Sequence, residues 1–158
     1  MTRAYLSLGS NLEPEKHLRA AIDELWAKFG AVNVSPTYRF PAVGFEGPDF
    51  LNLVAVIDTD LDPIALNDWL HDLENRHGRR RDMPRFSSRT LDIDIVLYGD
   101  DVIAGSNHLQ IPRDELKHAF VLQPMADIAG DVIHPISKRS IAELWRDSND
   151  VPGKEIDL

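Results

Sequence analysis

The sequence contains no cysteine among its 158 residues. Disulfide bonds and thiolate metal sites are therefore excluded, and the composition suits a reducing compartment. No apolar run approaches the roughly 20 residues that a membrane-spanning helix needs. The first residues also lack the apolar segment of a signal peptide. We therefore predict a cytoplasmic protein that is neither exported by that route nor embedded in a membrane.

Positive charge is scarce as well. The chain has 17 Lys and Arg against 26 Asp and Glu, which gives a formal net charge of −9. A general nucleic-acid binder needs a broad basic surface, so nucleic acid is excluded as a partner. The length and the 43% of hydrophobic residues suit one globular domain, residues 1–158, which we expect to act as a monomer.

The positive charge that is present is concentrated in one segment. Between Arg76 and Arg89 there are six arginines and a single acidic residue, Asp82, so this stretch carries +5. A charge run is usually a solvated face. In an acidic protein, however, a cluster of guanidinium forks suits a polyanion, because each fork stays charged and binds phosphate oxygens in pairs. The segment therefore favours phosphate binding.

A strand with two carboxylates follows at once. Leu91 to Tyr98 is β-branched, aliphatic or aromatic except for Asp92 and Asp94. Side chains alternate along a strand, so both aspartates share one face with Thr90, Val96 and Tyr98, and the Leu91 face includes Leu97. Mg²⁺ takes one or two protein carboxylates and fills its other positions with water and phosphate oxygens. The pair indicates a magnesium site, although a solvated strand face would show the same alternation.

The rest of the chain predicts an α+β fold. Strand, helix, strand, strand, helix, strand is the ferredoxin-like β-α-β-β-α-β order, here with extra C-terminal helices. Ser10 and Asn11 are candidate caps for the first helix, and Asp62-Pro63 opens the second. The expected strands are Arg3–Leu8, Val32–Phe40, Phe50–Ile57 and Leu91–Tyr98; the expected helices run to about Phe29, to about His77, from Val121 to Ala129 and around Ile141–Trp145; a short hairpin is expected over Val102–Ile111.

Two features lie before the second helix. The segment Pro41–Asp49 is rich in Gly and Pro and carries apolar residues, so it is either a loop that packs on something flat, such as a ring, or a loop pinned to its own core. Asn52 is an amide in an apolar strand, and a buried amide needs partners. It could meet the edge of a heterocycle or cap the backbone.

The segment Arg85–Val96, which reads RFSSRTLDIDIV, resembles the signature of the 6-hydroxymethyl-7,8-dihydropterin pyrophosphokinase family. The segments Tyr38–Gly44 and Pro48–Asn52 are also similar to that family, as is the Gly-Ser-Asn-Leu turn at Gly9. The resemblance covers nearly the whole chain. It implies transfer of diphosphate from ATP to 6-hydroxymethyl-7,8-dihydropterin in tetrahydrofolate biosynthesis, with ATP as co-substrate and two Mg²⁺ ions.

The resemblance also implies roles for residues at matching positions. The implied catalytic residues are Arg79 and Arg89, and the implied metal ligands are Asp92 and Asp94. The implied ATP-binding residues are Glu74, Arg81, Arg85, Ile95, Arg113, Lys117 and His118. The implied pterin-binding residues are Phe40, Pro41, Val43, Phe50, Asn52, Asp92 and Phe120.

The chain departs from the family pattern in three places. Phe40 stands where the family usually has Thr, and Ser87-Ser88 stands where it has Gly-Pro. Arg113-Asp114 and Lys117-His118 replace the family's His-Tyr pair and a following Arg. Two alternatives therefore stay open at this point: a non-catalytic nucleotide or pterin binder on the same scaffold, and another Mg²⁺-dependent phosphotransferase with a different acceptor.

Overall fold

A computed structural model describes residues 1–78, 88–106 and 109–158. Its main sheet has the strand order β5-β1-β4-β3-β8. The short strand β2 also pairs with β4, further along β4 than β3 does. Every pairing is antiparallel. The strands are β1 (Thr2–Ser10), β2 (Asn33–Val34), β3 (Thr37–Phe40), β4 (Phe50–Thr59), β5 (Asp92–Tyr98) and β8 (Lys154–Ile156). The first and fourth strands of the motif are thus neighbours, as the ferredoxin-like arrangement requires, and this predicted fold class is confirmed.

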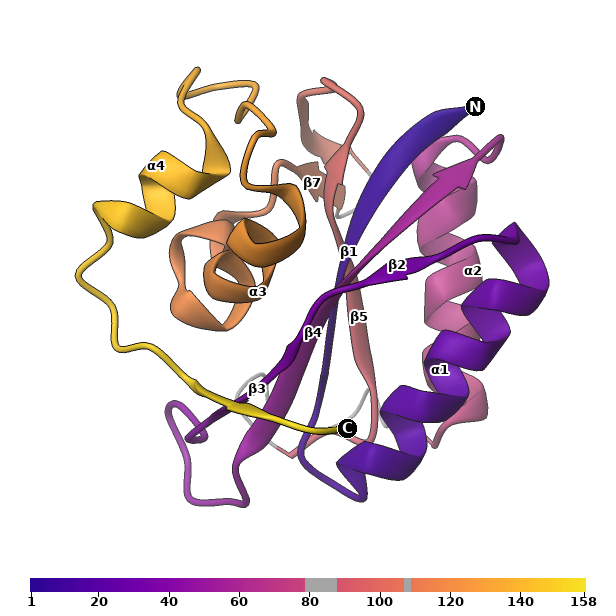
Figure 1. Cartoon of the computed structure of the whole chain (residues 1–158). Helices are drawn as coiled ribbons and strands as arrows, with labels where there is room; N and C mark the ends of the chain where they lie inside the picture. Colours follow the sequence, from indigo (N-terminus) through magenta and orange to yellow (C-terminus); the bar gives the residue numbers. More distant parts are fainter. Residues whose placement is uncertain (79–87, 107–108) are drawn as a thin grey trace.

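Helices cover both faces of the sheet. Figure 1 shows α1 (Pro14–Phe29) and α2 (Pro63–Arg76) on one face, and α3 (Ala119–Ala129) and α4 (Ile141–Arg146) on the other. A 3₁₀ turn (Asp114–Lys117) leads into α3, and β6 (Ile103–Ser106) pairs with β7 (Leu109–Ile111) in the predicted hairpin. Within the described ranges, no helix is long and apolar enough to cross a membrane.

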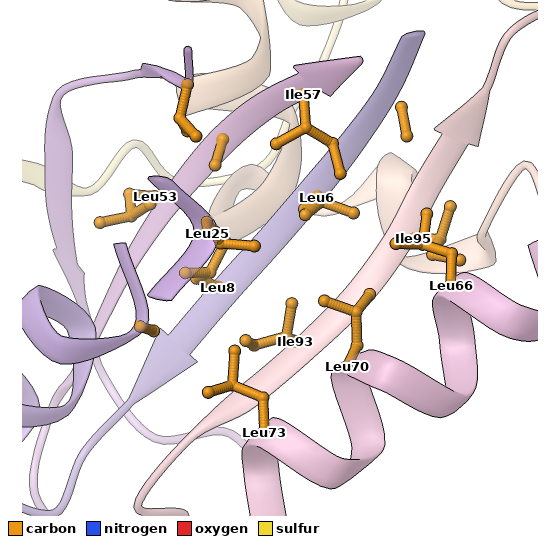
Figure 2. Packing of buried hydrophobic residues seen from close by; sticks show 14 of the residues in the cluster. Leu6, Leu8, Leu25, Leu53, Ile57, Leu66, Leu70, Leu73, Ile93 and Ile95 are labelled. Atoms are coloured by element: carbon orange, nitrogen blue, oxygen red, sulfur yellow. The ribbon is translucent and has the colours of Figure 1, made fainter. Parts of the chain in front are cut away.

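The larger part of the core lies between the sheet and the α1–α2 layer. Alternate residues of β1, β4 and β5 point there, because side chains on a strand have a period of two. Figure 2 shows them packed against α2, which contributes a leucine on each successive turn. The large side chains buried there include Leu6, Leu8, Leu53, Ile57, Ile93 and Ile95 from the strands, Leu18 and Leu25 from α1, and Leu66, Leu70 and Leu73 from α2. The opposite face is thereby left to α3, α4 and the polar residues of the strands.

Three local predictions were wrong. The expected strand Val32–Phe40 is broken at Ser35-Pro36, because the Ser35 hydroxyl accepts a hydrogen bond from Val54 N (2.8 Å) and the proline cannot donate one. Ser10 and Asn11 do not cap α1; its N-cap is Glu13, in the left-handed region and without a side-chain cap bond. The edge strand β8 was not predicted at all, since three residues carry too little periodicity.

A bulge changes the faces of the last β5 residues. The register of β5 against β1 shifts between Tyr5 and Leu6, so that Val96 has no direct partner. An extra residue in one strand reverses the alternation beyond it. Leu97 therefore packs with the α3 cluster and Tyr98 with the α1–α2 cluster, the reverse of the predicted assignment for both residues. Asp92 and Asp94 lie before the bulge, so their shared face is unaffected.

The C-terminal strap (residues 150–156) ties α3 to β3. Asp150 Oδ2 accepts a hydrogen bond from Ala119 N (2.8 Å), and Gly153 N donates to Gln123 Oε1 (2.7 Å). His118, the N-cap residue of α3, makes no side-chain cap bond. Asp150 therefore supplies the cap from 31 residues away.

Replacing Asp150 by alanine should lower the free energy of unfolding by about 1 kcal/mol at pH 7. The Ala119 N–H lowers the pKa of Asp150, so the carboxylate stabilises the fold above its unfolded pKa of roughly 4, and the contribution is lost as the pH falls through the lower folded value. The difference between wild type and Asp150→Ala, measured by denaturant unfolding, should therefore shrink from pH 7 to pH 3. Asp157→Ala, in the same exposed tail, is the control, and a gap that does not depend on pH would contradict the assigned cause.

Candidate functional site

The two aspartates of β5 face a row of functional side chains across the sheet. Asp92 pairs with Gly9, Gly9 pairs with Asn52, and Asn52 pairs with Tyr38. Directly paired residues project to the same face. Asp94 lies in the next row, opposite Ser7. The register therefore brings the carboxylate pair and the strand amide to one side of the sheet, the side of α3.

Gly9, in the middle of this row, gives room to the side chain of Asn52. Asp92 on β5 and Asn52 on β4 lie on either side of Gly9 on β1, so their backbones are two strand spacings apart, about 9.5 Å. A Cβ atom on Gly9 would lie 2.6 Å from Asn52 Nδ2, so the amide of Asn52 leans over the glycine. Glycine in a strand interior marks such a close approach. The sequence showed Gly9 as part of a turn and not as a site residue, because the need for glycine arises from a neighbour 43 residues away.

Asn52 is 7% exposed, and its Oδ1 has no hydrogen-bond partner among the described residues. A buried polar atom of this kind costs free energy until a partner reaches it. The interpretation of Asn52 as a backbone cap through this oxygen therefore finds no support. A ligand with an N–H group above Gly9 would satisfy the oxygen.

Asp94 is held in an unfavourable electrostatic environment. Burial and the neighbouring Asp92 carboxylate raise the pKa of Asp94 to about 8, against the opposing effect of Arg113. Arg113 Nη1 lies 3.6 Å from Asp94 Oδ1, while Arg113 Nε lies 3.1 Å from Glu115 Oε2. The side chain of Asp94 is still 29% exposed. A divalent cation could therefore reach the pair and relieve the repulsion.

No group of three or more His, Asp or Glu side chains in the described ranges is arranged to hold a metal ion. Two protein carboxylates are nevertheless enough for Mg²⁺ when water and phosphate oxygens supply the other ligands. The donor set of Asp92 and Asp94 fits that type of site. A cavity of about 290 Å³ lies elsewhere, beside the N-terminal end of α2, and none of the candidate residues lines it.

Arg89 is held at the start of β5 by the turn that follows β1. Asn11 N and Leu12 N both donate to Arg89 O (3.0 and 3.2 Å), and Arg89 N donates to Asn11 Oδ1 (2.7 Å). The backbone of Arg89 is thus fixed on both sides of its Cα. The remaining arginines expected to act here, Arg79, Arg81 and Arg85, lie outside the described residues.

The Pro41–Asp49 loop is largely exposed. Val43 is 65% exposed, and Pro41 is exposed as well. Phe45 is half-buried and packs edge-to-face on Phe50, with 6.4 Å between ring centroids. Phe45 thus pins the loop to β4, as one of the two alternatives expects, while Val43 faces outward, where a ligand could reach it.

The aromatic residues of the site lie near the start of α3. Phe40 is 7% exposed and packs with Tyr38 and Ala119, and a Cβ on Gly153 would lie 2.6 Å from its ring. The ring of Phe40 is thus committed to the core, which leaves its backbone for any ligand. Phe120 is half-buried and stacks on His118, with centroids 5.3 Å apart and 15° between the planes.

Three further candidates lie at different depths. Glu74 is 2% exposed, and its Oε2 accepts a hydrogen bond from Ile93 N (2.8 Å), the residue between the two aspartates. Ile95 is 1% exposed and points into the α1–α2 core, whereas Lys117 is exposed. The side chain of Glu74 therefore holds β5 in place by binding the backbone of that strand.

The sequence profile of the 7,8-dihydro-6-hydroxymethylpterin-pyrophosphokinase family matches residues 5–130. The 2-amino-4-hydroxy-6-hydroxymethyldihydropteridine pyrophosphokinase of Pseudomonas aeruginosa is 41% identical over 152 residues, covering 90% of this chain and 89% of the relative. The Haemophilus influenzae protein of the same name is 38% identical over 143 residues, covering 87% of this chain and 88% of the relative.

A solved structure with the same fold is the wild-type HPPK-DHPS of Plasmodium falciparum. It superimposes with a TM-score of 0.72 over 92% of this chain at 15% sequence identity, and this chain spans 44% of its length. At that identity the likeness concerns the fold alone. The sequence profile and the two bacterial relatives carry the assignment, and they agree over most of the chain: the protein belongs to the 7,8-dihydro-6-hydroxymethylpterin-pyrophosphokinase family.

Proposed function

We propose that this chain transfers diphosphate from ATP to 6-hydroxymethyl-7,8-dihydropterin, giving AMP and the pterin diphosphate, a step in tetrahydrofolate biosynthesis. The observation that carries the proposal is the row Asn52–Gly9–Asp92, which sets an unsatisfied amide two strands from a carboxylate pair. One end of this row suits a heterocycle and the other a metal-bound phosphate. The names of the bacterial relatives support diphosphate transfer to this pterin.

The acceptor would lie over Gly9. Asn52 Oδ1 would accept a hydrogen bond from the pterin ring edge, which offers N–H groups to the unsatisfied oxygen. Phe50 and Phe120 are half-buried aromatics on this side of the sheet, and their faces suit the flat ring. Pro41, Val43 and the backbone of Phe40 would complete the acceptor side. Such a site would orient the hydroxymethyl oxygen towards Asp92.

Asp92 and Asp94 would hold two Mg²⁺ ions, and the raised pKa of Asp94 marks a carboxylate that a cation would stabilise. Bound there, the ions supply charge neutralisation to the triphosphate and to the attacking hydroxymethyl oxygen. Arg113 already contacts Asp94, so it stands close enough to exchange that carboxylate for a phosphate.

The reaction is an in-line displacement at the β-phosphorus. A bond forms between the pterin hydroxymethyl oxygen and the β-phosphorus, and the hydroxyl proton is released. The bond between the β-phosphorus and the bridging oxygen breaks, and that oxygen leaves with AMP. Arg79 and Arg89 would neutralise the charge on the transferred group, because guanidinium forks bind phosphate oxygens in pairs. The nucleotide contacts would come from the side chains of Arg81, Arg85, Arg113, Lys117 and His118. The two buried candidates would act differently: Ile95 could offer only its backbone, and Glu74 would act through the strand that it holds at Ile93 N.

The proposal also includes a monomer of one domain, located in the cytoplasm. It rests on the absence of cysteine and on the ordinary composition of the chain. Sedimentation equilibrium at micromolar concentration would test the monomer, because a dimer would double the apparent mass.

AMP formation from ATP and Mg²⁺, with and without 6-hydroxymethyl-7,8-dihydropterin, tests the function. AMP that appears only with the pterin would establish the transfer and the acceptor together. The second candidate, a non-catalytic binder, is favoured by the contact of Arg113 with a proposed metal ligand. It predicts binding of ATP and pterin without AMP, and that result would overturn the proposal.

Replacing Gly9 by alanine should raise the KM for the pterin at least about 10-fold, because the new Cβ displaces the Asn52 amide from its place over the ring site. The KM for ATP should change little, since the carboxylate pair is left in place. Steady-state kinetics with each substrate varied in turn measures both values. Arg3→Ala, at the exposed far end of β1, is the control. Equal increases in both KM values would contradict the placement of the ring.

A further inference from the structure

Asn11 lies where three segments of the chain meet, and it is 2% exposed. Its Nδ2 donates to Pro48 O (3.0 Å) and to Ser88 Oγ (3.1 Å), and its Oδ1 accepts from Arg89 N (2.7 Å). A backbone N–H can only donate and a carbonyl oxygen can only accept, so these partners determine the orientation of the amide. All three side-chain bonds reach residues at least 37 positions away.

None of these bonds serves the helix that follows. The helix α1 begins at Pro14 with Glu13 as its N-cap, and Asn11 contributes no cap bond. The side chain of Asn11 instead holds two loops. On one side is Arg89, a proposed catalytic residue, whose carbonyl also accepts from Asn11 N and Leu12 N.

On the other side is the end of the Pro41–Asp49 loop, which carries residues of the proposed acceptor site. Pro48 O accepts from Asn11, and Gly47 lies against Ser88, where an added Cβ would be 3.2 Å from Ser88 Oγ. Ser88 stands where the family that this chain resembles usually has proline. Its hydroxyl gives Asn11 an acceptor that a proline side chain does not offer.

We propose that Asn11 is a positioning residue that, with Ser88, sets Arg89 and the acceptor loop relative to each other. The inference rests on the proposed function, because it assigns Arg89 to the phosphate side and the loop to the pterin side. Asn11 is buried and acts through these two segments. A displacement of about 1 Å between reacting groups can cost roughly 100-fold in rate, so one amide at this junction is enough to matter.

Asparagine at this position does two jobs, and two substitutions separate them. Asn11→Asp keeps an oxygen to accept from Arg89 N but removes both donors, so the acceptor loop is released while Arg89 stays held. Asn11→Ala removes all three bonds. Ser88→Ala removes one bond from the partner side, at a half-buried position where folding is at less risk. Asn149→Ala, at an exposed asparagine, is the control.

The four variants and the wild type are assayed for AMP formation with each substrate varied, and thermal unfolding confirms that each is folded. Asn11→Ala should lose about 30-fold in kcat and gain about 10-fold in pterin KM, within the range seen when supporting hydrogen bonds of a site are removed. Asn11→Asp should raise the pterin KM alone, and Ser88→Ala should raise it about threefold. In every variant the KM for ATP should stay within twofold of the wild-type value. The Asn149→Ala control should keep kcat and both KM values within twofold of the wild type.

Folded Asn11→Ala and Ser88→Ala proteins with wild-type kcat and pterin KM would overturn the inference. So would a loss of thermal stability without any kinetic change. If the wild type forms no AMP, the proposed function fails separately. Calorimetric titration of the same proteins with the pterin then tests the positioning role of Asn11. Weaker pterin binding by Asn11→Asp and Ser88→Ala would support that role, and unchanged binding would overturn it.

Discussion

Replacing Asp94 by asparagine is expected to lower kcat by about 1,000-fold, the effect of removing one group that stabilises transition-state charge. Asparagine has nearly the same shape as aspartate but lacks the negative charge that Mg²⁺ requires. Burial and the Asp92 carboxylate raise the pKa of Asp94 to about 8, so the ionised side chain destabilises the metal-free fold. The variant should therefore turn over far more slowly than the wild type and, without Mg²⁺, be at least as stable.

The measurement is AMP formation over a range of Mg²⁺ concentrations, together with thermal unfolding in EDTA. Asp100→Asn is the matched control, because Asp100 is an exposed aspartate in the turn directly after β5. A variant with undiminished turnover would exclude Asp94 as a metal ligand. A variant that melts well below the wild type would show that the carboxylate supports the fold, against the electrostatic argument.

Replacing Arg89 by alanine is expected to lower kcat by roughly 1,000-fold, the lower range for arginines that neutralise a transferring phosphoryl group. The fold should survive, because backbone bonds hold residue 89 whatever its side chain: Asn11 N and Leu12 N donate to its carbonyl, and its N–H donates to Asn11 Oδ1. The substitution leaves these bonds in place. The loss should therefore fall on turnover.

Arg89→Lys should recover part of the activity, since lysine keeps the charge but not the fork that binds two phosphate oxygens. Arg146→Ala is the control, because Arg146 is exposed and pairs only with Asp147 among the described residues. Single-turnover rates with saturating ATP and pterin separate chemistry from binding. Equal rates for the alanine and lysine variants would show that charge at position 89 plays no part.

Asp94 and Asn52 show the same conflict between stability and function. One is a carboxylate placed beside another carboxylate, and the other has an amide oxygen without a partner in the described part of the chain. Each costs free energy in the ligand-free protein, and each would be satisfied by a substrate or its metal. Such costs are expected at a binding site and are carried by the well-packed core beneath it, in which Leu6, Leu8 and Ile93 are fully buried.

The amino-acid pattern alone was enough to predict the β-α-β-β-α-β order, the α+β class and the shared face of Asp92 and Asp94. These depend on hydrophobic periods of two and about 3.6 residues, which are local and can be read along the chain. Membership of the family was also predictable, because Arg85–Val96 is one continuous segment.

Features that depend on distant partners became visible in the folded chain and not before. The bulge in β5 turned Leu97 and Tyr98 to the opposite faces, and Ser35-Pro36 broke an expected strand. Asn11, predicted as a helix cap, proved to join Arg89 to Pro48. Gly9 became part of the site because Asn52 leans over it from the neighbouring strand. Register and side-chain hydrogen bonds between segments are set when the whole chain packs, and no local pattern carries them.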